Sequence, residues 1–221
     1  MPDPLQPQLD AITRRTRELV QPERLATTEQ SIIELQTSRV LDRALRQGDP
    51  APQFALPDSQ QRIVRSEDLL AIGPLIINFF RGRWCPYCVT ELEAWRDRYE
   101  TVRERGALLV AISPQTTRQS DFAIQQHSLP FPLLRDEQCA LAEQFRIAYT
   151  VSPVQQQHYR SMMVNLPFIN GESSWRLPLA STFVVSQNGT LLYANTSSDF
   201  RQRPEPDEVI AALRTHSPSQ K

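Results

Sequence analysis

Lysine is nearly absent from this sequence, because Lys221, the last of its 221 residues, is the only one. Chemistry that needs a buried lysine is therefore excluded, including Schiff-base formation, phosphate binding by a P-loop and the ion pair of a protein kinase. Arginine carries the positive charge, and the formal net charge of −1 gives no electrostatic reason to expect a nucleic-acid or anionic-membrane partner.

Long apolar runs are also missing, since no window approaches the ~18 apolar residues of a membrane span. The first ten residues, MPDPLQPQLD, have prolines and acids where a signal peptide has positive charge and an apolar core. We therefore expect a cytoplasmic protein without a membrane partner. Its three cysteines are too few for a disulfide scaffold, so a C-x-x-C pair in such a compartment indicates redox or metal chemistry.

The first part of the chain has helical spacing and no strand signal. We interpret residues 1–46 as a helical arm that packs on the domain or mediates a homodimer, with Thr27 as the N-cap of its main helix. Prolines after Gly48 mark the entry to a domain that we expect at 47–216. Residues 217–221 are expected to be a disordered tail.

The domain itself shows an α/β order of elements. Buried strands are predicted at 74–80 and 107–113, and the helix between them carries apolar residues three or four positions apart. Further helices and a short strand follow, with a helix predicted at 154–163 in an irregular segment, then a hairpin around Asn188 and Gly189 and a closing helix. This order predicts a mixed central sheet with helices on both faces.

The pair Cys85 and Cys88 falls where the first buried strand turns into a helix, and Pro86 suits the first helical turn. The free N–H groups and positive dipole end of that helix favour a thiolate, as do Arg81 and Arg83 nearby. Cysteines in such settings have pKa values of ~3.5–7.5. The spacing of three also brings both sulfurs close enough to form a disulfide.

A metal site is the less favoured interpretation. One C-x-x-C supplies two of the four ligands of tetrahedral zinc, and His127, His158 and His216 show no paired spacing, so we predict neither a metal nor a bound cofactor. Cys139 lies within the amphipathic stretch DEQCALAEQF and is expected to pack in the core, with a distant resolving role as the alternative.

A family resemblance is carried by several stretches. WCPYC combines the tryptophan before the thioredoxin cysteines with the Pro-Tyr of glutaredoxins, and GDPAPQFALPD, FFRGRWCPYC, LLVAISPQT and STFVVSQNGT resemble the peroxiredoxin-like branch of the alkyl hydroperoxide reductase and thiol-specific antioxidant family. The resemblance covers roughly residues 47–215 and implies a thioredoxin fold. It also implies a thiol-dependent peroxidase with a Cys85–Cys88 disulfide cycle, reduced by thioredoxin, glutaredoxin or glutathione.

The sequence departs from the family's P-x-x-x-T-x-x-C pattern. That pattern places the peroxidatic cysteine at Cys88, the threonine at Cys85 and the proline at Arg81, while Glu91 matches a glutamate common in the family. The family's arginine would fall near Ala180. Hydrogen-bond donors for the peroxide would therefore come from backbone N–H groups or from Arg81, Arg83 or Arg176.

Two orders of attack remain open at this stage. A peroxiredoxin-like reaction would use Cys88 first, whereas thioredoxin-like exchange would use Cys85 first and make the protein a reductase of protein or glutathione disulfides. A non-catalytic binding module on the same fold is a third interpretation. The expected pocket residues are those next to the pair and those in a late loop: Arg81, Arg83, Trp84, Pro86, Tyr87, Glu91, Trp175 and Arg176.

Overall fold

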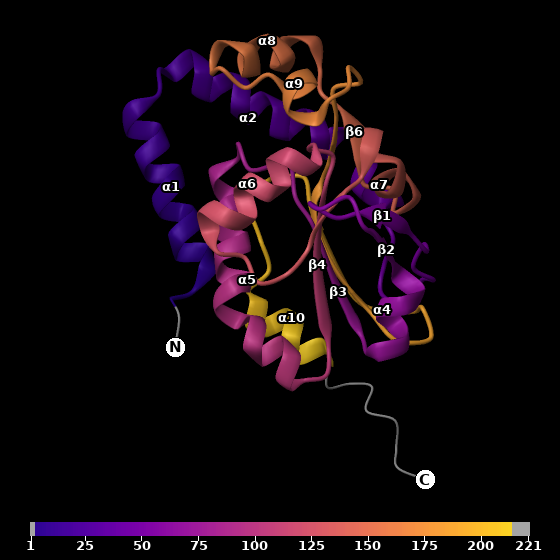
Figure 1. The fold of residues 1–221 in the computed structure, drawn as a ribbon. Helices are drawn as coiled ribbons and strands as arrows, with labels where there is room; N and C mark the ends of the chain where they lie inside the picture. The colour runs from indigo at the N-terminus through magenta and orange to yellow at the C-terminus, as the bar shows by residue number, and fades with distance from the viewer. Residues whose placement is uncertain (1–2, 214–221) are drawn as a thin grey trace.

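The structure is a computed structural model that describes residues 3–213. Its centre is a sheet in the order β5-β4-β3-β8-β9 (Figure 1). Strands β3, β4 and β5 are parallel to one another, and β8 runs antiparallel to both of its neighbours, β3 and β9. This is the mixed sheet of a thioredoxin fold, as predicted. The strands are β3 (Leu75–Phe79), β4 (Leu108–Ser113), β5 (Leu133–Arg135), β8 (Ala180–Val185) and β9 (Leu191–Ser197).

Helices cover both faces of this sheet because its strands are apolar on both sides. In β3, Ile76 belongs to one buried cluster and Ile77 to the other, as the period of two requires. The first cluster lies under α1 (Leu5–Leu19), α5 (Pro86–Glu104), α6 (Thr117–His127) and α10 (Pro206–Ala212). The second lies under α3 (Val40–Arg43), α4 (Ser66–Ile72), α7 (Ala140–Gln144) and the small hairpin of β1 (Ala55–Pro57) and β2 (Ile63–Arg65).

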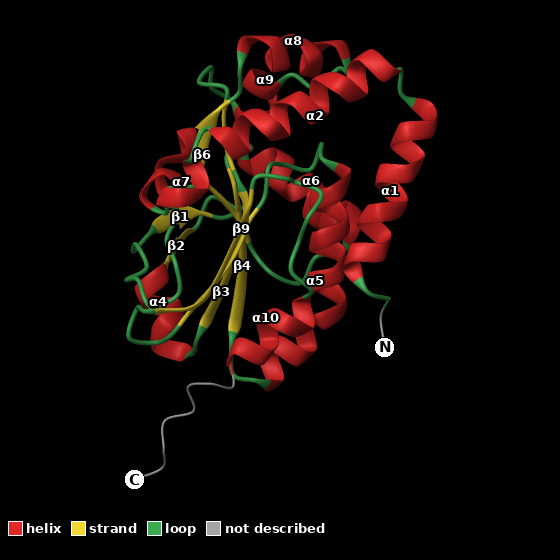
Figure 2. Ribbon diagram, turned by 180° about the vertical axis from the view of Figure 1, so that it is seen from behind, coloured by secondary structure: helices red, strands yellow, loops and turns green. Residues whose placement is uncertain are grey.

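The arm expected from the sequence consists of α1, α2 (Pro22–Thr37) and α3, and it lies along the domain (Figures 1 and 2). Helix α1 packs on α5, and the Glu205 carboxylate accepts hydrogen bonds from the first free backbone N–H groups of α1, those of Leu5 and Gln6, at 2.9 Å each. The predicted N-cap at Thr27 is wrong. Helix α2 begins at Pro22, which suits a first helical position, so Thr27 lies inside the helix.

The irregular segment between β5 and β8 forms a second cover. Strand β6 (Ala148–Thr150) pairs with β7 (Arg176–Pro178), and α8 (Pro153–Ser161) and α9 (Leu166–Asn170) lie between them. Helix α8 matches the helix predicted at 154–163 and packs against α2 of the arm, which places both above the end of the sheet (Figure 1). This end of the sheet is thus covered by segments from opposite halves of the chain, α2 and α8.

The stretch around Cys139 is not the single helix predicted. Gln138 and Cys139 both have positive φ, and a short 3₁₀ turn (Glu137–Cys139) precedes α7. The Asp136 carboxylate accepts hydrogen bonds from the backbone N–H groups of Leu141 and Ala142 and so caps α7.

No helix in the described part of the chain is both long and apolar enough to cross a membrane. The predicted domain end at 216 and the predicted tail at 217–221 lie outside the described residues.

Candidate active site

Both cysteines of the C-x-x-C pair sit at the start of α5, where β3 delivers the chain through a tight turn. Cys85 is the residue before the helix, Pro86 is its first residue, and Cys88 completes its first turn. Gly82 in this turn has a φ of 140°, and a Cβ there would lie 2.5 Å from Nε1 of Trp84. The turn therefore requires glycine, which lets Trp84 fold back over the chain. Both sulfurs are free thiols and buried, with Cys85 1% exposed and Cys88 fully buried.

Arg81 stands beside Cys85. Its Nη1 lies 3.9 Å from Cys85 Sγ, and its Nη2 donates a hydrogen bond to the Tyr159 hydroxyl. The guanidinium carbon lies 4.1 Å from the ring centre of Phe200 and 4.7 Å from that of Trp84. Arg81 has no carboxylate partner among residues 3–213, and a buried arginine held between aromatic faces in this way is a cation available to an anionic sulfur.

A second arginine stands beside Cys88. Nη2 of Arg203 lies 3.7 Å from Cys88 Sγ, and its Nε donates a hydrogen bond of 2.8 Å to Glu91. The other carboxylate oxygen of Glu91 accepts a 2.8 Å hydrogen bond from Asn78 on β3. The side chains of Glu91 and Arg203 are each 1% exposed, so the ion pair is held in place by the core. Each cysteine thus has its own arginine.

Arg203 was not predicted from the sequence. It lies in the loop between β9 and α10, far from the cysteines in the chain, whereas the family pattern pointed to Ala180 on β8. No spacing in the sequence connects this loop to the cysteine pair. Arg203 lies in a polar stretch just before the closing helix, and an arginine in such a stretch is ordinarily expected to be exposed to solvent.

The two thiols differ in their protonation. Burial by itself raises the pKa of Cys85, but the hydrogen bond from Cys88 and the charges of Arg81 and Arg203 outweigh it and lower that pKa to about 6. Burial and the neighbouring Cys85 thiolate raise the pKa of Cys88 well above the usual value of a thiol. At neutral pH the pair therefore holds one negative charge, on Cys85, and Cys88 donates its S–H to it.

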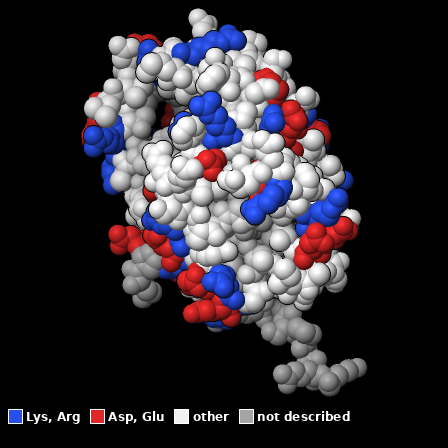
Figure 3. All heavy atoms as spheres, in the orientation of Figure 1, with Lys and Arg blue, Asp and Glu red and all other residues white. Residues whose placement is uncertain are grey.

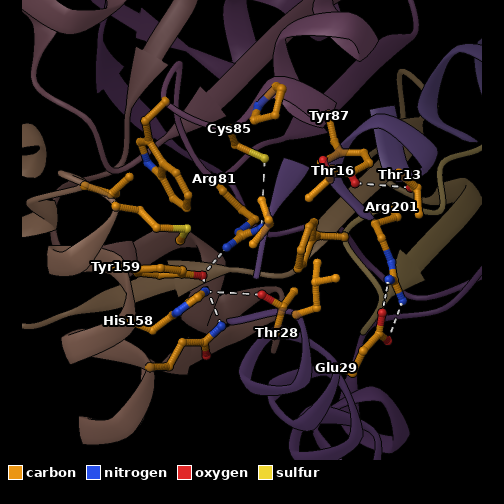
Figure 4. Close-up of a pocket in the computed structure, with 18 of the residues that line it drawn as sticks. Thr13, Thr16, Thr28, Glu29, Arg81, Cys85, Tyr87, His158, Tyr159 and Arg201 are labelled. Carbon is orange, nitrogen blue, oxygen red and sulfur yellow. Dashed lines mark hydrogen bonds and ion pairs between the residues drawn. The ribbon is translucent and has the colours of Figure 1, made fainter. Parts of the chain in front are cut away.

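A cavity of about 310 Å³ opens over Cys85 (Figure 4). Cys88 is not among the residues that line it, so only the thiolate faces this space. Helices α1, α2 and α8 form part of the wall, with residues such as Thr13, Thr28 and His158. Of the predicted pocket residues, those that line the cavity are Arg81, Trp84, Pro86 and Tyr87.

The structure does not bring the other predicted residues into this cavity. Arg83 points away, since its backbone N–H and guanidinium bond to Gln115 and Gln119. Trp175 packs in a separate small cluster, and Arg176 pairs with Glu143 on α7. Glu91 lies behind the cavity wall and acts on the site through its ion pair with Arg203, which contacts Cys88.

Cys139 lies apart from the pair, in the apolar cluster on the opposite face of the sheet. Burial, with Asp136 nearby, raises the pKa of its thiol well above the ordinary value. Its position is that of a small core residue. Within residues 3–213, no three His, Cys, Asp or Glu side chains converge in a way that could hold a metal ion.

The burial of Glu91 leads to a stability prediction. Burial outweighs the attraction of Arg203 and raises the pKa of Glu91 to about 7 from an ordinary 4.5. A carboxyl group with a raised pKa stabilises the fold fully below pH 4.5, and this contribution is lost as the pH rises through 7. Relative to Glu91→Gln, the wild-type protein should lose about 2 kcal/mol of unfolding free energy between pH 5 and pH 7.

Urea unfolding at both pH values would measure this difference. Glu100→Gln on the exposed side of the same helix is the control and should show no such change. A pH-independent difference between wild type and Glu91→Gln would mean that Glu91 stays ionised throughout this range.

Comparison with known proteins places this site in a family context. The AhpC/TSA family matches residues 47–194. Peroxiredoxin Q of the Sedum lineare chloroplast is 31% identical over 170 residues, which cover 76% of this chain and 77% of that protein. Peroxiredoxin Bcp of Bacillus subtilis is 29% identical over 100 residues, or 45% of this chain and 63% of that protein.

Solved structures show the same fold. Peroxidoxin BcpB of Mycobacterium tuberculosis superposes with a TM-score of 0.61 at 24% identity, covering 77% of this chain and 97% of that one. Peroxiredoxin Q of Xanthomonas campestris gives a TM-score of 0.56 at 20% identity, with 74% and 90% covered. Both comparisons leave part of this chain unmatched.

Proposed function

This chain belongs to the AhpC/TSA family and is a thiol-dependent peroxidase, and on that premise we propose that Cys85, not Cys88, attacks the peroxide. The observation that carries the proposal is that only Cys85 lines the cavity, next to Arg81. The lowered pKa of Cys85 and the raised pKa of Cys88 support the same order. The order is thus the reverse of the one that the family pattern assigns.

The chemical steps follow from these positions. The Cys85 thiolate attacks the peroxide oxygen that bears hydrogen, and an S–O bond forms as the O–O bond breaks. The leaving oxygen takes up a proton from water and departs as an alcohol or as water. Arg81, which also lines the cavity, stabilises the charge that develops on the leaving oxygen. The Cys88 thiol then attacks the sulfenic acid on Cys85, forming the Cys85–Cys88 disulfide and releasing water.

Arg203 and Glu91 serve the second step. When Cys88 gives up its proton to attack, the Arg203 guanidinium at 3.7 Å stabilises the thiolate that forms. Glu91 and Asn78 hold Arg203 in that position, so we assign Glu91 as a positioning residue. A reducing compartment such as the cytoplasm would return both thiols to their free form between turnovers.

The other functions considered from the sequence have less support. A reductase of protein disulfides needs a nucleophilic sulfur at the surface, whereas Cys85 is 1% exposed beneath the arm. A non-catalytic module would have no use for a lowered pKa at one cysteine and a matched arginine at each. The reaction with a peroxide requires only that a small peroxide molecule enters the cavity over Cys85.

The test of the proposal is selective alkylation of the reduced wild-type protein. At pH 7, iodoacetamide should label Cys85 at least ~10-fold faster than Cys88, because only the thiolate reacts. The rate should fall as the pH drops through about 6, the pKa of Cys85, and peptide mass mapping would assign each label. Preferential labelling of Cys88 would overturn the proposed order.

A further inference from the structure

The arm closes over the cavity through three polar contacts from separate points along it. Thr13 on α1 lies 3.1 Å from the Tyr87 hydroxyl, and Thr28 on α2 lies 3.2 Å from Nε2 of His158. Glu29 on α2 accepts two hydrogen bonds from Arg201, the shorter at 2.6 Å. These contacts join the arm to α5, to α8 and to the loop after β9, so four parts of the chain border the cavity.

The burial of Cys85 at the bottom of this cavity limits which reductants can reach the Cys85–Cys88 disulfide. A reductant must bring its sulfur into direct contact with Cys85, because exchange proceeds by attack of a thiolate on a disulfide sulfur. A cavity of about 310 Å³ accommodates a small organic molecule. A folded protein carries its reactive cysteine on a surface of helices and loops, and one helix alone is about 10–12 Å across. Such a surface does not fit beneath the closed arm.

The charge of the cavity wall further limits which small thiols can act as the reductant. Its ionised side chains are three arginines and one glutamate: Arg17, Arg81, Arg201 and Glu29. Arg201 is paired with both Glu29 and Asp199, whereas Arg17, at the exposed rim, has no ion-pair partner among residues 3–213. Burial and the nearby charge of Arg24 lower the pKa of His158, so it adds no charge at neutral pH. Once the disulfide has formed, the wall is positive on balance.

One outer face of the molecule can be compared with the cavity wall. On the face shown in Figure 3, basic and acidic side chains are interspersed without a broad field of one sign. A cavity lined by positive charge raises the local concentration of anions.

We infer that the Cys85–Cys88 disulfide is reduced inside the cavity by a low-molecular-weight thiol bearing carboxylates, and not by a folded thioredoxin- or glutaredoxin-type protein. The inference rests on the proposed function. One small thiolate attacks Cys85 Sγ, the S–S bond breaks, and Cys88 takes the electron pair and then a proton. A second small thiolate attacks the sulfur of the bound thiol. The small disulfide leaves, and the Cys85 thiolate is restored.

The test uses the full chain oxidised with one equivalent of hydrogen peroxide and freed of excess peroxide. Stopped-flow fluorescence of Trp84 follows its reduction by glutathione, which bears two carboxylates, by cysteamine, which bears none, and by a thioredoxin kept reduced by its reductase. Corrected for thiolate content, glutathione should react at least ~10-fold faster than cysteamine. The thioredoxin should be at least ~100-fold slower than glutathione, since it must wait for a rarely populated open arm.

Two outcomes would overturn the inference: thioredoxin matching glutathione, or cysteamine matching glutathione. Either leaves the proposed function intact, because the oxidation step is recorded separately in the same instrument. Slow oxidation by hydrogen peroxide would instead reject the proposed function. The two failures are therefore distinguishable.

Two variants of α1 test whether the preference for glutathione over cysteamine comes from the cavity wall. Arg17→Glu reverses a charge on the cavity wall and should lower the preference for glutathione over cysteamine by about 10-fold. Arg14→Glu makes the same change at an exposed position of α1 that does not line the cavity, and it should leave the preference unchanged. Equal effects of both variants would assign the preference to the outer surface and contradict the inference.

Discussion

Replacing Cys85 with serine should slow the reaction with hydrogen peroxide at least a thousandfold. Removal of the catalytic nucleophile of a serine protease lowers kcat by about 10⁶-fold. Cys85 is the cysteine that faces the cavity, and it carries the negative charge of the pair at neutral pH. A serine hydroxyl has the same position without an accessible anionic form. Stopped-flow fluorescence and the intact mass after peroxide treatment would measure the loss.

Cys88→Ser is the matched variant and should behave differently. Its Cys85 still meets the peroxide beside Arg81, so the first oxidation should proceed, but no disulfide can form within the pair. A trapped sulfenic acid at Cys85, detected as a mass increase with dimedone, is the expected product. If Cys85→Ser forms the sulfenic acid at Cys88 and Cys88→Ser is inert, the order of attack is that of the family pattern.

Arg81→Met should slow oxidation by hydrogen peroxide about 10²–10³-fold. Methionine fills a similar length between Phe200 and Trp84 but removes the charge that lies 3.9 Å from Cys85 Sγ. Two effects combine, because the thiolate loses a stabilising cation and the leaving oxygen loses a donor. The pH midpoint for alkylation of Cys85 should move above 6, which a purely structural role of Arg81 would not cause.

Arg83→Met provides the control for this prediction. Arg83 lies two residues before Cys85 and is closer to the pair in sequence than Arg81, but its guanidinium bonds to Gln119 on α6. Its replacement should leave both the oxidation rate and the alkylation midpoint within about twofold of wild type. Equal effects of the two variants would mean that general positive charge, and not the placement of Arg81, activates Cys85.

Local sequence was enough to predict the part of the site that local structure builds. The apolar run before Arg81 and Pro86 at the first helical position predicted a strand and a helix, and these form β3 and α5. A fold with helices on both faces followed from the same kind of pattern. The position of both cysteines at a helix N-terminus was therefore correct before any tertiary contact was known.

The order of attack could not be predicted in this way. Cys85 and Cys88 share the same helix terminus and the same flanking arginines in sequence. They differ because the arm and α8 build a cavity over one of them, while Arg203 reaches the other from a distant loop. The sequence does not distinguish Arg81 from Arg83 either. The turn at Gly82 lies between them and directs their side chains to different sides.

The loop between β9 and α10 contacts both the arm and the site, and this has a consequence for how the protein is made. Within a few residues, Arg201 holds α2, Arg203 reaches Cys88, and Glu205 caps the start of α1. At translation rates of about 5–20 residues per second, Arg203 is synthesised roughly 10 s after Cys88, which lies 115 residues earlier. A nascent chain on the ribosome therefore holds its cysteines and its arm before it holds Arg203 and Glu205, and the complete site can form only after this loop has been synthesised.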